Sequence, residues 1–287
     1  MSERRVLHSD KFPSLLREIN DPPKKLYLEG TLPDEAEYTY LAVIGSRKFS
    51  SYGKEACEKL LAGLAGHPIA IVSGLALGMD AIAHKAALKA GLPTIAVPGS
   101  GLDRSVLYPS SNRRLAEEIV DAGGALLSEF EPTFRATLYS FPQRNRIVAG
   151  MSKATLVVEA AEKSGALITA RLALDYNRDV LVVPGSIFSP TAKGTNKLIR
   201  NGAMPVTSSD DILQQLGMAG EKTVTQATLD LTESEEKVLS LLIEPLPRDE
   251  LFSQAELAPG EGQALLMTME LKGLIQEVGG EIHSLTS

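Results

Sequence analysis

The segment Tyr40-Leu41-Ala42-Val43-Ile44-Gly45-Ser46-Arg47 decides the fold class of this 287-residue chain. Its apolar half is typical of a strand buried on both faces, and a glycine, a serine and an arginine follow at once. Similar apolar runs recur at 69–72, 94–97, 125–127, 155–158 and 180–183. Helical periodicity covers 53–65, 78–90, 112–122, 164–176, 193–201 and 209–216. The alternation predicts an α/β protein, an extended Rossmann-like parallel sheet with helices on both faces.

Composition limits where the protein works. The N-terminus has no apolar signal region, and no apolar run approaches the ~20 residues that span a bilayer. Cys57 is the only cysteine, so the chain has no internal disulfide and a reducing cytoplasm is the expected location. Cys57 shares an apolar helix face with Leu60, Leu61 and Leu64, which favours core packing over reactivity.

The net charge of −7 is unevenly distributed. From Gln226 to the end, twelve acidic side chains face three basic ones, a net of −9, whereas residues 1–225 hold 24 acidic and 26 basic side chains, a net of +2. Composition changes around 217–223, which is typical of a linker. The predicted organisation is a lead-in at 1–39 packed on the next domain, a Rossmann-like domain at 40–217, a linker at 218–227 and a small domain at 228–287.

Small polar residues follow most of the predicted strands. In such folds ligands bind beyond the carboxyl ends of the strands, where glycine lets the backbone approach a ligand and serine adds a donor. The turns concerned are Gly45-Ser46-Arg47, Ser73-Gly74, Gly99-Ser100-Gly101, Ser164-Gly165 and Pro184-Gly185-Ser186. Tight turns alone also require glycine. The recurrence of these turns beside available arginines favours a phosphate-binding crest.

Two arginines in the segment Phe141-Pro142-Gln143-Arg144-Asn145-Arg146 add to this prediction. On a helix Arg144 and Arg146 diverge by roughly 200°, so they cannot share one face. They suit a helix start, where N–H groups and guanidinium forks converge on phosphate. The alternative is a buried arginine–carboxylate network, with Glu159 as a plausible partner. We expect one arginine to face the crest and the other to point inward.

Other ligand motifs are absent or weak. No G-x-G-x-x-G opens the first helix, and Lys193-Gly194-Thr195 lacks the glycine loop of a Walker sequence. Asp80 and His84 lie four residues apart and could form an acid–base or metal pair. A capping Asp80 and a histidine bonded to a neighbouring loop are favoured instead. We expect no metal, no cofactor and no catalytic residue.

Taken in order, these motifs closely resemble those of the DNA-processing protein A family, also called Smf. The resemblance covers about 13–216 and rests on the strand-end turns above, the run Phe141 to Ile147, and Ser164-Gly165-x-Leu167-Ile168-Thr169. It implies an extended Rossmann fold that binds single-stranded DNA, forms a homodimer and loads the RecA recombinase during natural transformation. The resemblance makes Arg47 a DNA contact and places Ser46, Ser73, Gly74 and the Gly99-Ser100-Gly101 turn around a phosphate pocket.

The sequence departs from that family at two points. Ser110 stands where the family commonly has a DNA-contacting lysine, and Arg113 and Arg114 could compensate. The chain also starts too late to include the helical extension that often precedes the family's Rossmann domain. The predicted DNA-binding set is therefore Gly45, Ser46, Arg47, Ser73, Gly74, Gly99, Ser100, Gly101, Arg113, Arg144, Asn145 and Arg146.

The C-terminal segment predicts a small winged-helix domain. Thr232 precedes a helix whose first turn is acidic, a short helix is expected at 248–253, and a third helix at 263–272 precedes a hairpin. Winged helices usually bind duplex DNA, but Lys272 is the only cation of this third helix. Phosphate binding needs cations, so a protein-contact or regulatory role is favoured.

Two functions remain. The favoured one is a non-enzymatic binder of single-stranded DNA and recombinase loader. The alternative is an enzyme or sensor for a free nucleotide, because related Rossmann-like proteins cleave nucleoside monophosphates. Pro184-Gly185-Ser186 lacks the glutamate of their loop, and Glu159 is the only strand-end carboxylate that could substitute.

Overall fold

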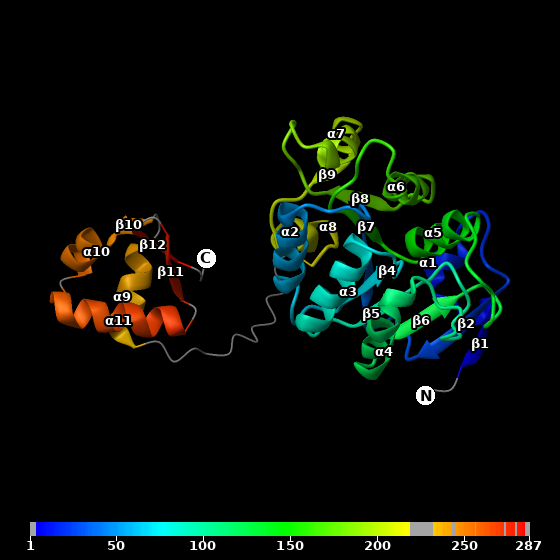
Figure 1. The fold of residues 1–287 in the computed structure, drawn as a ribbon, viewed down its shortest axis with the longest axis horizontal. Coiled ribbons are helices and arrows are strands. Elements are labelled where there is room, and N and C mark those ends of the chain that lie inside the picture. Colours follow the sequence, from blue (N-terminus) through cyan, green and yellow to red (C-terminus); the bar gives the residue numbers. More distant parts are fainter. Residues whose placement is uncertain are drawn as a thin grey trace. The chain divides into compact units, whose positions relative to one another are not determined.

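The computed structural model describes residues 4–218, 232–242, 245–255, 257–272, 274–278 and 280–284. The chain divides into two compact units, Met1–Thr223 and Val224–Ser287, and each is described by itself (Figure 1). The linker predicted at 218–227 falls, except for Met218, outside the described residues and stays a prediction. Within the part of the chain that the structure describes, no helix combines the length and apolar character needed to cross a membrane.

The larger unit is built on a nine-stranded sheet in the order β1-β2-β6-β5-β4-β3-β7-β8-β9. The parallel strands are β3 (Thr39–Ile44), β4 (Ile69–Ser73), β5 (Thr94–Ala96), β6 (Ala125–Ser128), β7 (Ala154–Val157), β8 (Asp179–Val182) and β9 (Met204–Pro205). The six strands predicted from apolar runs are all present within a residue or so of their expected bounds. From β3 the chain first adds β4, β5 and β6 on one side of the sheet and then β7, β8 and β9 on the other side. The connections on the two sides of β3 therefore run in opposite directions, which leaves a crevice at the carboxyl ends of β3, β4 and β7.

Helices cover both faces of this sheet, as the sequence predicted (Figure 1). Side chains of β3 alternate: Leu41 and Val43 pack in one apolar cluster, and Ala42 and Ile44 in the other. The first cluster is covered by α2 (Ser51–Ala62), α3 (Met79–Lys89) and α8 (Ser209–Gln215), and the second by α1 (Ser14–Arg17), α5 (Ser140–Gly150) and α6 (Ala166–Asp175). The remaining helices of this unit are α4 (Arg113–Asp121) and α7 (Lys193–Arg200). Cys57 lies fully buried in the first cluster, which confirms its core role.

The segment before β3 extends the sheet with two strands that the apolar pattern did not predict. The strand β2 (Lys25–Gly30) runs antiparallel to β6, and β1 (Arg5–His8) runs antiparallel to β2. In each strand the apolar run is only two or three residues long and is flanked by charged or polar residues, so both lack the longer apolar run of a central strand such as β3.

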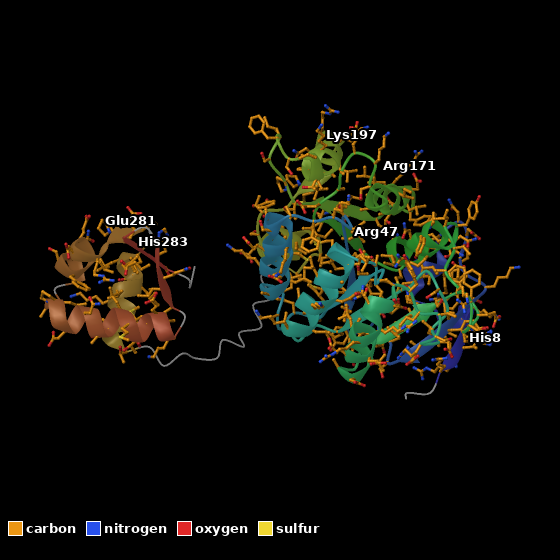
Figure 2. All side chains as sticks on the ribbon, viewed as in Figure 1. His8, Arg47, Arg171, Lys197, Glu281 and His283 are labelled. Atoms are coloured by element: carbon orange, nitrogen blue, oxygen red, sulfur yellow. The ribbon has the colours of Figure 1, made fainter. Side chains whose placement is uncertain are left out.

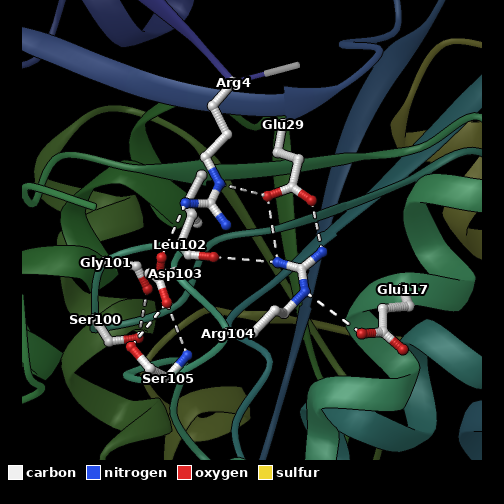
Figure 3. A network of polar contacts seen from close by, with 9 residues as sticks. All are labelled: Arg4, Glu29, Ser100, Gly101, Leu102, Asp103, Arg104, Ser105 and Glu117. Carbon is white, nitrogen blue, oxygen red and sulfur yellow. Dashed lines mark hydrogen bonds and ion pairs between the residues drawn. The ribbon is translucent and has the colours of Figure 1, made fainter. Parts of the chain in front are cut away.

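A network of ion pairs fastens this added edge to the loop after β5 (Figure 3). The buried carboxylate of Glu29 in β2 accepts hydrogen bonds from Arg4 at 3.0 Å and from Arg104 at 2.5 Å. Arg4 also reaches Asp103 at 3.4 Å, and Arg104 lies 3.6 Å from Glu117 of α4. The loop at 100–105 is thus held by ion pairs to Arg4, to Glu29 of β2 and to Glu117 of α4.

The described residues of the smaller unit form three helices and a three-stranded sheet ordered β10-β12-β11. Its elements are α9 (Glu233–Leu241), β10 (Leu246–Pro247), α10 (Arg248–Ala255), α11 (Pro259–Leu271), β11 (Ile275–Val278) and β12 (Glu281–Ser284). Thr232 caps α9 as predicted, because its hydroxyl accepts from the Glu235 N–H and the Glu235 carboxylate accepts from the Thr232 N–H. The helix α11 begins four residues earlier than predicted, because Pro259 occupies its first turn and Gly262 packs against the Phe252 ring.

Two cations of this smaller unit, Lys272 and Arg248, are engaged by its own acids. Lys272 donates to the buried carboxylate of Glu235 at 2.7 Å, and this ion pair lowers the pKa of Glu235. Arg248 pairs with Glu277 and donates to Gln263 at 3.1 Å. The predicted cation of the third helix is therefore committed to an internal contact.

Candidate nucleic-acid interface

A cavity of about 680 Å³ opens at the carboxyl edge of the sheet, beside the ends of β3 and β4. It brings together six of the predicted residues: Gly45, Ser46, Arg47, Gly74, Arg144 and Asn145. The carboxyl ends of parallel strands meet at one edge, which is why turns separated by about thirty residues come together.

The loop after β3 is fixed by its own backbone. The Ser46 N–H donates to the Glu159 carbonyl at 2.7 Å, and the Ser46 carbonyl accepts from the Met79 N–H at 3.1 Å. The Ser46 hydroxyl accepts from the Lys48 N–H at 3.1 Å. A Cβ on Gly45 would lie 2.7 Å from the Met79 side chain, so only glycine lets this loop sit against α3.

Arg47 is an exposed cation of this loop and is labelled in Figure 2. Its guanidinium carbon lies 5.3 Å from the centroid of the Phe141 ring, and that ring lies 5.5 Å from the ring of Tyr108. Gly99 lines the shallow recess beneath these groups, where a Cβ would contact the Phe141 ring. A permanent charge therefore stands beside an aromatic surface at the mouth of the cavity.

Arg144 is buried beneath that surface instead of starting a helix. It sits in the second turn of α5, and one guanidinium nitrogen donates to the carbonyls of Gly74 and Val97. Asp80 lies on the same side of Gly74 as Arg144, and a Cβ on that glycine would overlap the guanidinium and contact the Asp80 carboxylate. Burial lowers the pKa of Arg144 and raises that of Asp80, and the attraction between the two charges opposes both shifts. The Nε of Arg144 has no hydrogen-bond partner among the described residues.

Arg146 points elsewhere, as the divergence on the helix required. It pairs with Glu129 and lies 3.5 Å from Asp21, and it does not line the cavity. The expectation that Glu159 is the carboxylate partner of one arginine is wrong. Glu159 accepts instead from the N–H and hydroxyl of Ser50, at 2.8 and 2.7 Å, and from the hydroxyl of Thr191 at 2.7 Å.

Four other predicted residues have structural contacts away from the cavity. The hydroxyl of Ser73 donates to the Val43 carbonyl and is fully buried. Ser100 is also fully buried, and its hydroxyl accepts from the Tyr108 N–H at 3.1 Å. The remaining two are Gly101, which packs against the backbone of residues 131–132, and Arg113, which donates to the Ser105 carbonyl at 3.3 Å.

Two lysines that the sequence reasoning missed line the cavity. Lys48 follows Arg47, and Lys163 precedes the Ser164-Gly165 turn. Each lysine is the immediate neighbour of a strand-end turn that the sequence pattern identifies, so both could have been predicted by including the residues that flank these turns. Together with Arg47 and Arg144 they give this edge a positive lining, with Asp80 beside Arg144 as the opposing acid.

Asp80 and His84 do not form a metal pair. Asp80 accepts from the Ala76 N–H at 3.3 Å, so it stabilises the loop before α3, while Gly78 occupies the cap position predicted for it. His84 is fully buried and contacts the Thr94 hydroxyl at 2.8 Å, in strand β5 and not in a loop. Within the described ranges, no group of three or more His, Cys, Asp or Glu side chains could hold a metal ion.

Comparison with known proteins places the chain in a family. Residues 4–217 match the family described as DNA recombination-mediator protein A, and residues 222–281 match the DprA winged helix domain. Protein Smf of Escherichia coli is 44% identical over 209 residues, which are 72% of this chain and 55% of that protein, so the match spans about half of its length. The DNA processing protein DprA of Streptococcus pneumoniae is 43% identical over 72% of this chain and 71% of its own length.

Solved structures agree with these matches. The X-ray structure of the Streptococcus pneumoniae DprA superposes with a TM-score of 0.68 at 39% identity, covering 74% of each chain. A DprA of Helicobacter pylori, described for its unique single-stranded DNA binding mode, has a TM-score of 0.65 at 32% identity, covering 75% of this chain and 98% of its own. The chain described here therefore belongs to the DNA recombination-mediator protein A family.

Proposed function

We propose that this protein binds single-stranded DNA at the cavity edge and acts in DNA processing as a recombination mediator. The observation that carries the proposal is the exposed Arg47 guanidinium, 5.3 Å from the Phe141 ring and beside the cations Lys48 and Lys163. Cations that follow the phosphates and aromatic rings that stack with bases are the two elements of single-strand recognition. Duplex DNA hides its base faces, so such a surface favours the single strand.

The proposals on the partner protein, the oligomeric state and the location rest on membership of the family. Membership supports a role in which the protein loads the RecA recombinase during natural transformation, as a cytoplasmic homodimer without catalytic activity. The proposed DNA contacts are Arg47, Lys48 and Lys163, with Gly45, Ser46, Gly74 and Asn145 shaping the cavity and Arg144 supporting it from below. In this proposal the remaining predicted residues maintain the loops around the site.

The alternative, cleavage of a nucleoside monophosphate, needs a carboxylate that can reach the ribose. Glu159 is 3% exposed and already accepts three hydrogen bonds, and Asp80 lies against Arg144. Neither carboxylate is available to a substrate in this arrangement, so the binding function is favoured.

One experiment separates these functions. Fluorescence anisotropy measures the affinity for a labelled single strand, and chromatography of the same sample with each nucleoside monophosphate measures release of the free base. We expect tight strand binding and no release. The enzyme would be favoured instead if the wild-type protein released the base and did not bind the strand, and if a Glu159→Gln variant no longer released the base. A strand-exchange reaction in which single-strand-binding protein blocks RecA tests the loading step.

A further inference from the structure

A second cavity, of about 560 Å³, lies on the other side of the loop that closes the first. Pro190 and Thr191 line the first cavity, while their neighbours Ser189 and Ala192 line the second. The Thr191 hydroxyl donates to the buried Glu159 carboxylate at 2.7 Å, which anchors this shared wall. A strand held in the first cavity therefore needs to cross only one short loop to enter the second.

The lining of the second cavity differs in chemistry from that of the first. The described residues that line it include no Lys or Arg, and the acidic one among them is Glu159. The lining combines apolar residues such as Val158, Val183 and Pro184 with serine and threonine residues. A phosphate group would find no cation among the described residues of this lining, so the cavity suits a neutral group with an apolar face and polar edges.

Tyr52 gives this cavity a fixed aromatic wall. Its hydroxyl donates to the Pro184 carbonyl at 2.7 Å, which ties the first turn of α2 to the loop after β8. The ring is nevertheless 52% exposed, so it is held in place while much of its surface is free. Phe188, on the same loop after β8, is 88% exposed. A ring that is already ordered loses little conformational entropy when a base stacks on it.

We propose that the second cavity receives a nucleobase of the same single strand whose phosphates are bound at Arg47, with Tyr52 as the stacking surface. The inference rests on the proposed function and extends it, because it assigns the base to a subsite separate from the phosphate contacts. A nucleobase is neutral and planar and carries polar edges, which matches the lining. The strand runs over the wall formed by 189–192, from the first, cationic cavity to the second.

The test uses the full-length protein and two thymidine strands, a dinucleotide and an oligonucleotide of about 16 nucleotides. The short strand can fill the first cavity alone, whereas the long one reaches both. Tyr52→Ala should lower the affinity for the long strand about tenfold, which is within the range for loss of one base stack. The affinity for the short strand should stay nearly unchanged. Tyr52→Phe keeps the ring and should bind the long strand as the wild type does. Leu174→Ala, a variant at an exposed residue of α6 outside both cavities, is the matched control.

Photocrosslinking locates the base directly. Long strands that carry one 5-iodouracil at successive positions are irradiated on the wild-type protein, and the linked peptides are identified by mass spectrometry. We expect one strand position to crosslink at Tyr52 and a different one at Phe141. Crosslinks confined to Phe141, with normal binding of both strands by Tyr52→Ala, would overturn the inference.

Two further outcomes are informative. If Tyr52→Phe loses as much affinity as Tyr52→Ala, the bond to Pro184 and not stacking is responsible, and the subsite is rejected. If the wild-type protein binds neither strand, the proposed function itself fails, which is distinct from a failure of the second cavity.

Discussion

Replacement of Arg144 by alanine should destabilise the larger unit more than any surface substitution. Arg144 is 5% exposed, and its guanidinium donates to the carbonyls of Gly74 and Val97 and lies beside the Asp80 carboxylate over Gly74. The variant leaves the Asp80 carboxylate buried without its opposing charge. It also removes the donor from two carbonyls at the ends of neighbouring strands.

The expected cost follows from these contacts. Removing one partner of a buried charged pair typically costs about 3–5 kcal/mol, because the other charge stays uncompensated. For a unit of this size each kcal/mol lowers the melting temperature by about 2–4 °C. The melting temperature of the larger unit should therefore fall by roughly 6–20 °C. Water that enters the adjoining cavity would hydrate Asp80 and favours the lower part of this range.

Differential scanning calorimetry of the full-length protein measures this change in the transition of the larger unit. Arg171→Ala is the matched control, because Arg171 is 84% exposed and its one ion pair, with Asp175, is 4.0 Å long. Such an exposed pair is worth less than about 1 kcal/mol. A melting temperature for Arg144→Ala within 2 °C of this control would refute the structural role assigned to Arg144; this limit is about the effect of 1 kcal/mol.

Three other perturbations test separate parts of the account. Arg47→Ala should weaken single-strand binding by about 1.5–3 kcal/mol with an unchanged melting temperature, and Arg47→Lys should restore only part of the loss; normal affinity of the alanine variant would remove Arg47 from the site. Burial, aided by the charge of Arg144, lowers the pKa of His84 to about 3, so between pH 6.5 and 3 the unfolded chain binds one more proton than the folded protein. Stability should then fall with decreasing pH by up to about 1.4 kcal/mol per unit, and His84→Leu should flatten this slope in pH-dependent denaturation; equal slopes would contradict the assignment. Deletion of 226–287, with its net charge of −9, should leave single-strand affinity unchanged or slightly higher at low salt, whereas a tenfold loss in titrations of a folded variant would make the winged helix a DNA-binding element.

The sheet could be predicted from the sequence because its central strands are buried on both faces and consist almost entirely of apolar residues. The added strands β1 and β2 could not, because residues such as Glu29 are buried only through the ion pairs with Arg4 and Arg104. Apolar periodicity does not detect a strand that is stabilised by distant charges.

The candidate site was predicted in outline and less well in detail. The turns around Gly45 and Gly74 meet because parallel strands end at one edge, which the pattern implies. The partner of each arginine depends on which loops meet in three dimensions. Glu159 was expected to bind an arginine, but it binds Ser50 and Thr191 instead, from segments more than a hundred and about thirty residues away.

In the proposed function, a cationic edge with exposed aromatic rings selects single-stranded DNA by its phosphates and its stacked bases. A titration of labelled single-stranded and duplex oligonucleotides against the full-length protein, repeated from low to physiological salt, tests it most directly. With Arg47, Lys48 and Lys163 each contacting one phosphate, the logarithm of single-strand affinity should fall with the logarithm of salt concentration at a slope of about −2. The single strand should also bind more tightly than the duplex at every salt concentration. Equal affinity for duplex and single strand, or an affinity that does not change with salt, would contradict the account.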